Sequence, residues 1–220
     1  MARLVDLSHE IEHGMVTYRG LPAPAISDWL SRDASAARYA PGTTFQIGRI
    51  DLLANTGTYI DAPFHRYAGG KDIADYPLES IADLAGIVIR AARRTGRSLD
   101  ASWVRERDVR GKAVLVHTGW DAHWRTDAYA TGHPFLDRDA AEHLAAAGAA
   151  LVGIDSLNID DDGDGARPAH TILLDAGIPI VEHLCNLGAL PDAGFRFFAV
   201  PARVKGMGSF PVRAFGIVDP

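Results

Sequence analysis

The segment from Asn55 to His65 gathers more chemically capable side chains than any other stretch of the chain. Asp61 and His65 lie four residues apart within it, and one helical turn would put both side chains on the same face. A carboxylate and an imidazole placed in this way can converge on one metal ion or on one substrate atom. The same spacing also suits a hydrogen-bonded surface pair, so the pattern by itself leaves both interpretations open.

The residues around this segment indicate how it is held. An apolar run, Leu52 to Ala54, supplies the end of a strand, and Gly57, Pro63 and Gly69 with its neighbouring glycine interrupt regular structure. We therefore expect the aspartate and the histidine to lie on a turn or at the start of a short helix.

Short apolar runs recur along the chain, with one clear helix among them. We expect strands at 3–9, 45–53, 86–92, 113–117, 150–154 and 178–182. Residues 137–147 carry apolar residues at helical spacing, with Asp137 as the N-terminal cap and Gly148 as the stop signal. Buried strands that alternate with helices predict an α/β fold, in which catalytic groups collect at the strand ends.

The composition is that of a small enzyme. The 220 residues are 47% hydrophobic and no linker or repeat divides them, so we expect a single domain over residues 1–220. A net charge of −6 without a basic stripe argues against nucleic acid as a partner. No apolar stretch reaches the roughly 18 residues that span a membrane, which argues against a membrane partner. Cys185 is the single cysteine, so no intrachain disulfide forms, and we expect a cytoplasmic protein.

The segment from Asn55 to His65 resembles the signature of the cyclase family, which includes bacterial kynurenine formamidase and isatin hydrolase. The family pattern is His-x-Gly-Thr-His-x-Asp-x-Pro-x-His, and this chain matches it at Gly57, Thr58, Asp61, Pro63 and His65. Further similarity follows in the same order within 6–9, 14–20, 118–120, 153–156, 168–170, 177–187 and 206–214. The resemblance thus covers essentially the whole chain. It implies a single-domain swivelling β/β/α fold with a mixed sheet, and a homodimer or homotetramer.

The chain departs from the family pattern at two positions. Asn55 and Tyr59 stand where the family has its first two histidines, which with the aspartate hold a divalent ion. An asparagine offers a carbonyl oxygen but is a poor zinc ligand, and a neutral tyrosine is a poorer one. We therefore do not expect a normal two-metal centre.

The retained positions imply where the chemistry takes place. The matching residues contribute in the family to a second metal, to a bridging carboxylate and to the catalytic histidine; they are Asp61, His65, His170 and Glu182. These four groups could hold one Zn²⁺ or Mn²⁺, and no other cofactor is expected. The alternative is a metal-free centre in which the carboxylates share protons with the histidines.

Aromatic side chains near the motifs carry the remaining information about the substrate. These residues are Tyr18, Trp29, Phe45, Phe64 and Trp120. They could line a pocket for a flat ring, although core packing is the alternative for each of them. As a set they favour an aromatic or cyclic small molecule as the substrate. The local charges give an acidic substrate little support.

The acidic run from Asp160 to Gly165 imitates the start of a calcium-binding EF-hand loop. Thr171, however, occupies the twelfth position, where a bidentate glutamate is needed. We interpret the run as a flexible acidic loop before His170. Arg167, which follows it, could pair with those aspartates or with a substrate carboxylate.

Together these observations predict a cyclase-family hydrolase that acts on a small cyclic or aryl amide or ester, such as an arylformamide, a lactam or a lactone. His65 or His170 would deprotonate water, the carboxylates would hold a metal or orient the histidines, and Asn55 or Tyr59 would stabilise the oxyanion. Two alternatives stay open. One is a metal-independent cyclase or dehydratase of a natural-product pathway, and the other is a non-catalytic protein that binds a small molecule.

Overall fold

Apolar side chains that alternate between two faces build the central strands. In β7 (Ala113–His117), Val114 and Val116 belong to one buried cluster, whereas Ala113 and Leu115 belong to another. The strands β5 (Leu84–Arg90), β9 (Leu151–Ile154) and β10 (Ile180–Glu182) divide their side chains in the same way. A strand covered on both faces needs apolar residues at successive positions, which explains the continuous apolar runs in the sequence.

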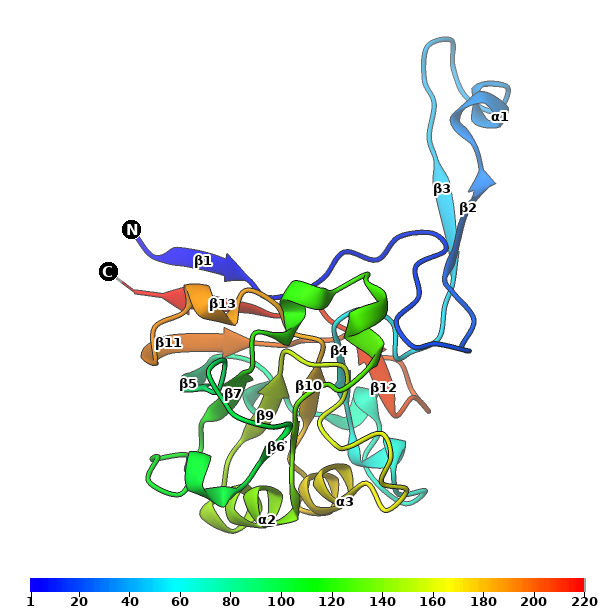
Figure 1. Ribbon diagram of the computed structural model, residues 1–220. Coiled ribbons are helices and arrows are strands. Elements are labelled where there is room, and N and C mark those ends of the chain that lie inside the picture. Colours follow the sequence, from blue (N-terminus) through cyan, green and yellow to red (C-terminus); the bar gives the residue numbers. More distant parts are fainter. Residues whose placement is uncertain (220) are drawn as a thin grey trace.

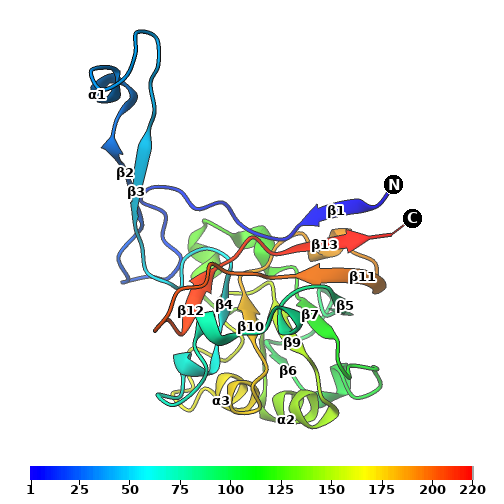
Figure 2. The same cartoon turned by 180° about the vertical axis from the view of Figure 1, so that it is seen from behind.

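The computed structural model describes residues 1–219 and joins these strands into one nine-stranded mixed sheet (Figure 1). The strand order is β1-β13-β11-β5-β7-β9-β10-β4-β12, in which β5, β7, β9 and β10 are parallel and the other neighbours antiparallel. The first and last strands pair with each other (Figure 2). The bounds of the outer strands are β1 (Arg3–Asp6), β4 (Tyr59–Asp61), β11 (Ala193–Phe198), β12 (Ser209–Pro211) and β13 (Phe215–Val218).

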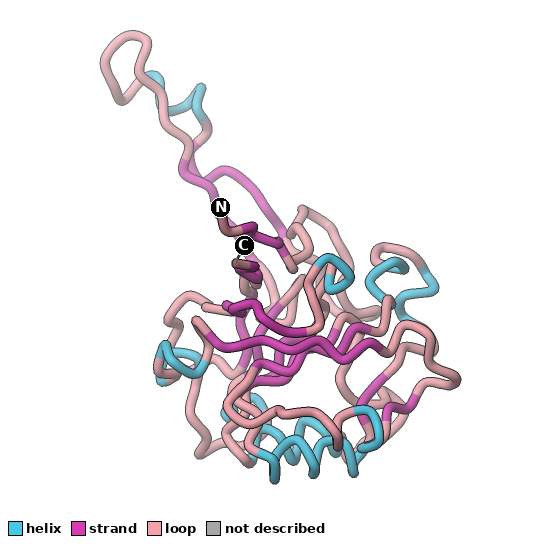
Figure 3. The backbone as a smooth tube through the Cα atoms, turned by 90° about the vertical axis from the view of Figure 1, so that its left-hand side faces the viewer, coloured by secondary structure: helices cyan, strands magenta, loops and turns pink. Residues whose placement is uncertain are grey.

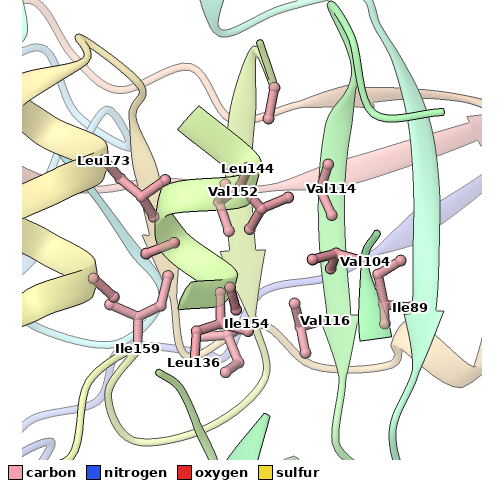
Figure 4. Packing of buried hydrophobic residues seen from close by; sticks show 14 of the residues in the cluster. Ile89, Val104, Val114, Val116, Leu136, Leu144, Val152, Ile154, Ile159 and Leu173 are labelled. Carbon is pink, nitrogen blue, oxygen red and sulfur yellow. The ribbon is translucent and has the colours of Figure 1, made fainter. Parts of the chain in front are cut away.

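Two helices cover one face of this sheet, α2 (Arg138–Ala147) and α3 (Pro168–Asp175) (Figure 3). The side chain of Asp137 accepts a hydrogen bond from the first turn of α2, and Gly148 ends the helix with a φ of 79°. Both ends of α2 therefore confirm the prediction. Leu144 of α2 and Leu173 of α3 pack on Val152 in the core cluster that Figure 4 shows.

The opposite face packs against the curled part of the same sheet. Val5 of β1 and Phe195 and Phe197 of β11 share a cluster with Leu115 and Val181. A separate two-stranded sheet is formed by β6 (Ser98–Leu99) and β8 (Phe135–Leu136). Short 3-10 helices lie in the connections, at Pro63–His65, Ile73–Asp75, Leu78–Ser80, Ala101–Trp103, Trp120–His123, Asp127–Ala130 and Leu187–Ala189.

A narrow arm projects away from the body (Figures 1 and 2). It consists of β2 (Ala25–Leu30), the short helix α1 (Arg32–Ala36) and β3 (Ile47–Asp51), and the two strands pair with each other. Every residue of β3 is exposed. The sequence predicted a strand over 45–53, which is confirmed, but its apolar residues face solvent because, within residues 1–219, β2 and β3 pair only with each other.

The observed elements confirm the α/β class. The strands predicted at 86–92, 113–117, 150–154 and 178–182 are present with small shifts at their ends, and the opening strand stops at Asp6. None of the helices within residues 1–219 has the length and apolar character needed to cross a membrane.

Candidate active site

Two neighbouring strands place the acidic residues of the site. In the antiparallel pair β4–β10, Tyr59 lies opposite Glu182 and Asp61 lies opposite Ile180. Side chains alternate along a strand, so Tyr59, Asp61 and Glu182 emerge on the face where Ile180 packs beneath α3. All three are buried. The sequence placed Asp61 on a turn, but it is the last residue of a strand because its backbone pairs with both β10 and β12.

His65 is the last residue of the 3-10 helix Pro63–His65, whereas the sequence placed it on a turn or at the start of a short helix. Ser209 of β12 lies opposite Asp61 and donates its hydroxyl proton to Asp61 Oδ1. The same hydroxyl oxygen is 3.0 Å from His65 Nδ1, so Nδ1 must carry the hydrogen of that bond. The Nε2 of His65, whose side chain is 37% exposed, is then the nitrogen that can accept a proton.

His170 reaches the carboxylates from the first turn of α3. Its Nδ1 lies 2.6 Å from Asp160 Oδ2, and Asp160 also accepts the backbone N–H groups of Ala169 and His170 at 2.6 and 3.0 Å. A carboxylate in this position assigns the hydrogen to Nδ1. The other ring nitrogen, Nε2, lies 3.7 Å from Asp61 Oδ2 and 3.7 Å from Glu182 Oε1.

Two tyrosines hold the carboxylate of Glu182. Its Oε2 accepts hydrogen bonds from the hydroxyl of Tyr59 and, at 3.2 Å, from that of Tyr18. Its Oε1 accepts the backbone N–H of Ile159 at 2.6 Å. The two hydroxyl oxygens are 2.7 Å apart. Since Tyr59 donates its single proton to Glu182, it has none for a substrate oxygen in this arrangement.

Burial and charge shift the pKa values of this cluster in different directions. Burial alone would lower the pKa of His170, but the carboxylates of Glu182, Asp160 and Asp61 raise it to about 10. Burial raises the pKa of Glu182, and the charge of His170 opposes that shift. Burial and the Glu182 carboxylate raise the pKa of Tyr59 well above its usual value. Without a metal, the cluster therefore holds a protonated imidazole between two carboxylates at neutral pH.

A divalent metal ion fits the same groups. Asp61 Oδ2 is buried and has no hydrogen-bond partner within residues 1–219. One ligand atom from each of Asp61, His65 and His170 lies within 4.8 Å of the others. Glu182 Oε1 also lies 3.7 Å from His170 Nε2. Carboxylate oxygens and imidazole nitrogens are the donors that bind Zn²⁺ or Mn²⁺, and a carboxylate behind a ligating histidine, as Asp160 is here, orients it.

A cavity of about 330 Å³ opens over these groups. Tyr59, His65 and His170 form part of its wall, with Tyr18 and Asn55 beside them. A volume of roughly 300 Å³ is at the lower end of the range for small-molecule sites. The cavity therefore gives a small molecule access to the nitrogen of His65.

The structure separates the five aromatic residues that the sequence singled out. Tyr18 lines the cavity, and the other four do not. Trp29 and Phe45 lie on the arm and are 72% and 52% exposed, and Phe64 is 36% exposed. Trp120 donates its indole N–H to a backbone carbonyl, that of Tyr129, at 3.0 Å. Their closeness to motifs in the sequence did not bring these four side chains to the cavity, because the hairpin and the loops carry them elsewhere.

Sequence reasoning missed two residues that orient the site. Asp160 is fully buried and bonded to His170, so it is not part of a flexible loop. The N-cap rule gives no signal for it, because Asp160 stands eight residues before Pro168 and Arg167 occupies the cap position. Ser209 lies in a segment that resembles the family, but its bridging position between Asp61 and His65 had no signal in the sequence.

Comparison with known proteins agrees with this geometry. The family model "Putative cyclase" matches residues 5–161. The kynurenine formamidase of Salinibacter ruber is 31% identical over 216 residues, which cover 96% of this chain and 95% of that protein. A solved structure described as a potential metal-dependent hydrolase with cyclase activity has a TM-score of 0.82 at 25% identity, with both chains covered in full.

Isatin hydrolase A from Labrenzia aggregata has the same fold, with a TM-score of 0.84 at 23% identity over all of this chain and 94% of its own. These structural matches confirm the fold that the resemblance implied. The named relatives are hydrolases, as the resemblance also implied. With a family model that covers more than half of its length, the chain belongs to the cyclase family.

Proposed function

We propose that this protein hydrolyses a small aryl or cyclic amide or ester at its carbonyl group, with an arylformamide, a lactam or a lactone as the substrate. One observation carries the proposal. His170 Nε2 meets the carboxylates of Asp61 and Glu182 beneath a cavity whose wall also holds the exposed His65. Relatives named for the hydrolysis of a kynurenine formamide and of isatin support the substrate class.

We assign His65 as the general base. Its Nδ1–H is held by Ser209, so Nε2 can take a proton from water as the water oxygen attacks the carbonyl carbon. The same nitrogen can return that proton to the leaving nitrogen or oxygen as the bond to carbon breaks. His170 is less suited to this role because Asp160 binds its Nδ1 and two carboxylates face its Nε2.

The amide of Asn55 is the neutral donor best placed for the developing oxyanion. It lines the cavity, and its Nδ2 donates one hydrogen bond to Ser209 Oγ at 3.2 Å, which leaves a second hydrogen. Donors aimed at the carbonyl oxygen stabilise the charge that forms in the transition state. Tyr59 supports the site indirectly, by holding Glu182.

We further propose that Asp61, His170 and Glu182 hold one Zn²⁺ or Mn²⁺, which leaves the Nε2 of His65 free to act as the base. Such an ion would polarise the carbonyl group and lower the pKa of bound water. Asp160 then orients His170, and the tyrosine hydroxyls orient Glu182. The buried Asp61 Oδ2 without a partner is the observation that supports this proposal.

A substrate panel tests the hydrolase. Formanilide, the formamide of kynurenine, isatin and an aryl lactone are incubated with the untagged protein, and the products are followed by mass spectrometry. We expect a gain of the mass of water on at least one of them, and loss of that product with His65→Ala. Elemental mass spectrometry is expected to find about one zinc or manganese per chain in the wild type and none in Asp61→Ala. A wild type that adds water to none of these classes contradicts the proposal.

The second candidate is a metal-independent cyclase or dehydratase. It is favoured by a specific arrangement, since His170 Nε2 lies 3.7 Å from a carboxylate oxygen of Asp61 and of Glu182, and these charges raise the pKa of the imidazole to about 10. Such a cluster can act as an acid–base centre. Product mass separates the two candidates. Cyclisation conserves the substrate mass and dehydration loses water, whereas hydrolysis adds it.

We also propose a homodimer or homotetramer in which the arm contacts a second copy of the chain. Trp29, Ile47 and Ile50 are between 49% and 72% exposed on a two-stranded ribbon, a structure that is marginally stable alone. Light scattering on the purified protein should give a multiple of the chain mass. Ile50→Asp should shift it toward the monomer, and a wild type that is already monomeric contradicts this proposal.

A cytoplasmic location stays a prediction. Its support is the single cysteine, Cys185, which is buried and has no cysteine partner in the chain. Fractionation of the source cells would check it, with the expected protein in the fraction of a cytoplasmic marker enzyme.

A further inference from the structure

Two arginines, Arg66 and Arg167, line the cavity over the site. Each comes from the backbone that carries a site histidine. Arg66 directly follows the 3-10 helix that ends at His65, and Arg167 directly precedes α3, which carries His170 in its first turn. The same local structure therefore positions a cation and a histidine on both segments.

The acidic loop does not neutralise the charge of Arg167. Its guanidinium donates to neutral acceptors, the side-chain oxygen of Asn158 at 3.2 Å and the carbonyl oxygen of Asp161 at 3.4 Å. The carboxylates of Asp161 and Asp162 instead pair with Arg97, at 2.9 and 3.7 Å. Arg167 is thus a cation at the cavity without a paired carboxylate among residues 1–219, although four aspartates lie between positions 160 and 164.

Arg66 is held in a way that leaves its terminal nitrogens for a ligand. Its Nε donates to Thr171 Oγ1 at 3.3 Å, and the guanidinium lies 5.2 Å from the ring centre of Tyr67. The backbone N–H of Thr171 donates to the carbonyl oxygen of Arg167 at 2.9 Å, so both arginines are anchored to the same turn of α3. Within residues 1–219, neither Arg66 nor Arg167 has a carboxylate partner in an ion pair.

The backbone of Arg167 adds a further observation. Its φ of 46° lies in the left-handed region, where a residue with a side chain is strained by roughly 1 kcal/mol or more. Glycine would adopt this conformation freely. Strain of this kind persists where the surrounding structure requires it, and here it directs the chain from the loop into the helix that carries His170.

We infer that the substrate carries a carboxylate and that Arg66 and Arg167 recognise it at the wall of the cavity. The inference rests on the proposed function, since it assigns a charged substituent to the substrate of the same site. Guanidinium groups bind carboxylates through paired N–H donors, and two cations without carboxylate partners beside a cavity attract an anion. The local charges in the sequence did not favour an acidic substrate, because these arginines are far apart in the chain and come together only through Thr171.

Isothermal titration of benzoate and of benzamide tests the inference without any turnover. The two ligands have nearly the same shape and differ in charge. We expect the wild type to prefer benzoate, and Arg66→Gln or Arg167→Gln to lower that preference by about tenfold. Arg167→Lys should keep part of it because the charge remains. Arg107→Gln removes an exposed arginine outside the cavity and serves as the matched control.

The inference is overturned if the wild type shows no preference for benzoate, or if both glutamine variants keep the full preference. Retention in both variants would mean that the carboxylate binds elsewhere in the site, for example to a metal ion. Circular dichroism confirms that each variant is folded.

A kinetic pair separates this inference from the proposed function. Formanilide and 2-formamidobenzoate differ by one carboxylate. We expect the glutamine variants to lower kcat/KM for 2-formamidobenzoate, relative to that for formanilide, by about tenfold. If the wild type hydrolyses neither compound and none of the other panel substrates, while benzoate binding still depends on both arginines, the proposed hydrolase fails and the anion site stands. If hydrolysis is seen but the ratio is unchanged in both variants, the anion site fails and the hydrolase stands.

Discussion

Two buried histidines on either side of Glu182 behave in opposite ways. His170 and His183 are 7% and 0% exposed, so burial is nearly the same for both. The neighbouring carboxylates raise the pKa of His170 to about 10 against the effect of burial. Burial, with the charges of His9 and His133, lowers the pKa of His183 well below its usual value. The partners of a buried imidazole, and not its depth, therefore decide its charge.

The partners also define two clusters, a charged one of His170 with Asp61 and Glu182 and a neutral one of His183 with two tyrosines. His183 bonds to neutral hydroxyls, that of Tyr129 at 2.8 Å and that of Tyr18 at 3.1 Å. Tyr18 in turn contacts the carboxylate of Glu182. The neutral cluster thus supports the wall of the charged one, and we expect chemistry to depend on His170 far more than on His183.

The largest expected effect on catalysis comes from substituting His170, and substituting His183 provides the comparison. His170→Ala should lower kcat/KM for hydrolysis by about 1000-fold, because it removes a charged partner of both carboxylates and a proposed metal ligand. His183→Gln should lower it by no more than about tenfold. Steady-state kinetics on variants with native circular dichroism spectra measure both. Equal losses would show that the clusters are not functionally distinct.

The next effect concerns the carboxylate behind His170. Asp160→Asn should weaken zinc binding by about 10- to 100-fold, because an outer carboxylate orients a ligating histidine and raises its basicity. Competition with a chelating dye measures the affinity. Asp164→Asn, an exposed position in the same loop, is the control and should have little effect. An unchanged zinc affinity in Asp160→Asn would show that the Asp160 carboxylate does not orient His170 for metal binding.

In protein freed of metal by a chelator, a buried histidine with a lowered pKa and one with a raised pKa should change the unfolding free energy in opposite directions as the pH changes. The pKa of His9, which burial lowers to about 4, means that the unfolded chain binds a proton between pH 6.5 and 4 that the folded chain does not. The unfolding free energy therefore falls as the solution is acidified through this window. For His170 the folded chain holds the extra proton, so stability is lost as pH rises from 6.5 to about 10.

Urea unfolding at a series of pH values measures the acid and the alkaline side of this stability curve. His9→Gln should reduce the slope on the acid side, and His170→Gln should reduce it on the alkaline side, by at most about 1.4 kcal/mol per pH unit for one proton. An alkaline limb that is unchanged in His170→Gln would mean that this imidazole is not the group that titrates there.

The smallest expected effect is in the neutral cluster. Tyr129→Phe removes the hydroxyl that bonds to His183 Nδ1, and it should lower the unfolding free energy by about 1 to 2 kcal/mol because a buried nitrogen loses its partner. Thermal unfolding measures this loss. A change in metal content on the same substitution would show that the two clusters are coupled more closely than their charges indicate.

Local features of the chain were sufficient to predict much of the fold. The helix from Arg138 to Ala147 follows from its apolar spacing, its cap at Asp137 and its stop at Gly148, all within one short segment. The buried strands follow in the same way from continuous apolar runs such as Ala113–His117. Periodicity and capping depend on neighbouring residues, so they can be recognised before the tertiary structure is known.

The sequence by itself therefore determined the α/β class, the main elements and, through the family signature, the segment that carries Asp61 and His65. Only the tertiary structure decided how these residues are used. Ser209 bridges Asp61 and His65 across 144 positions of the chain, and Asp160 turns inward to hold His170. Contacts of this kind depend on which strands become neighbours and on where helices pack, and no local periodicity records them.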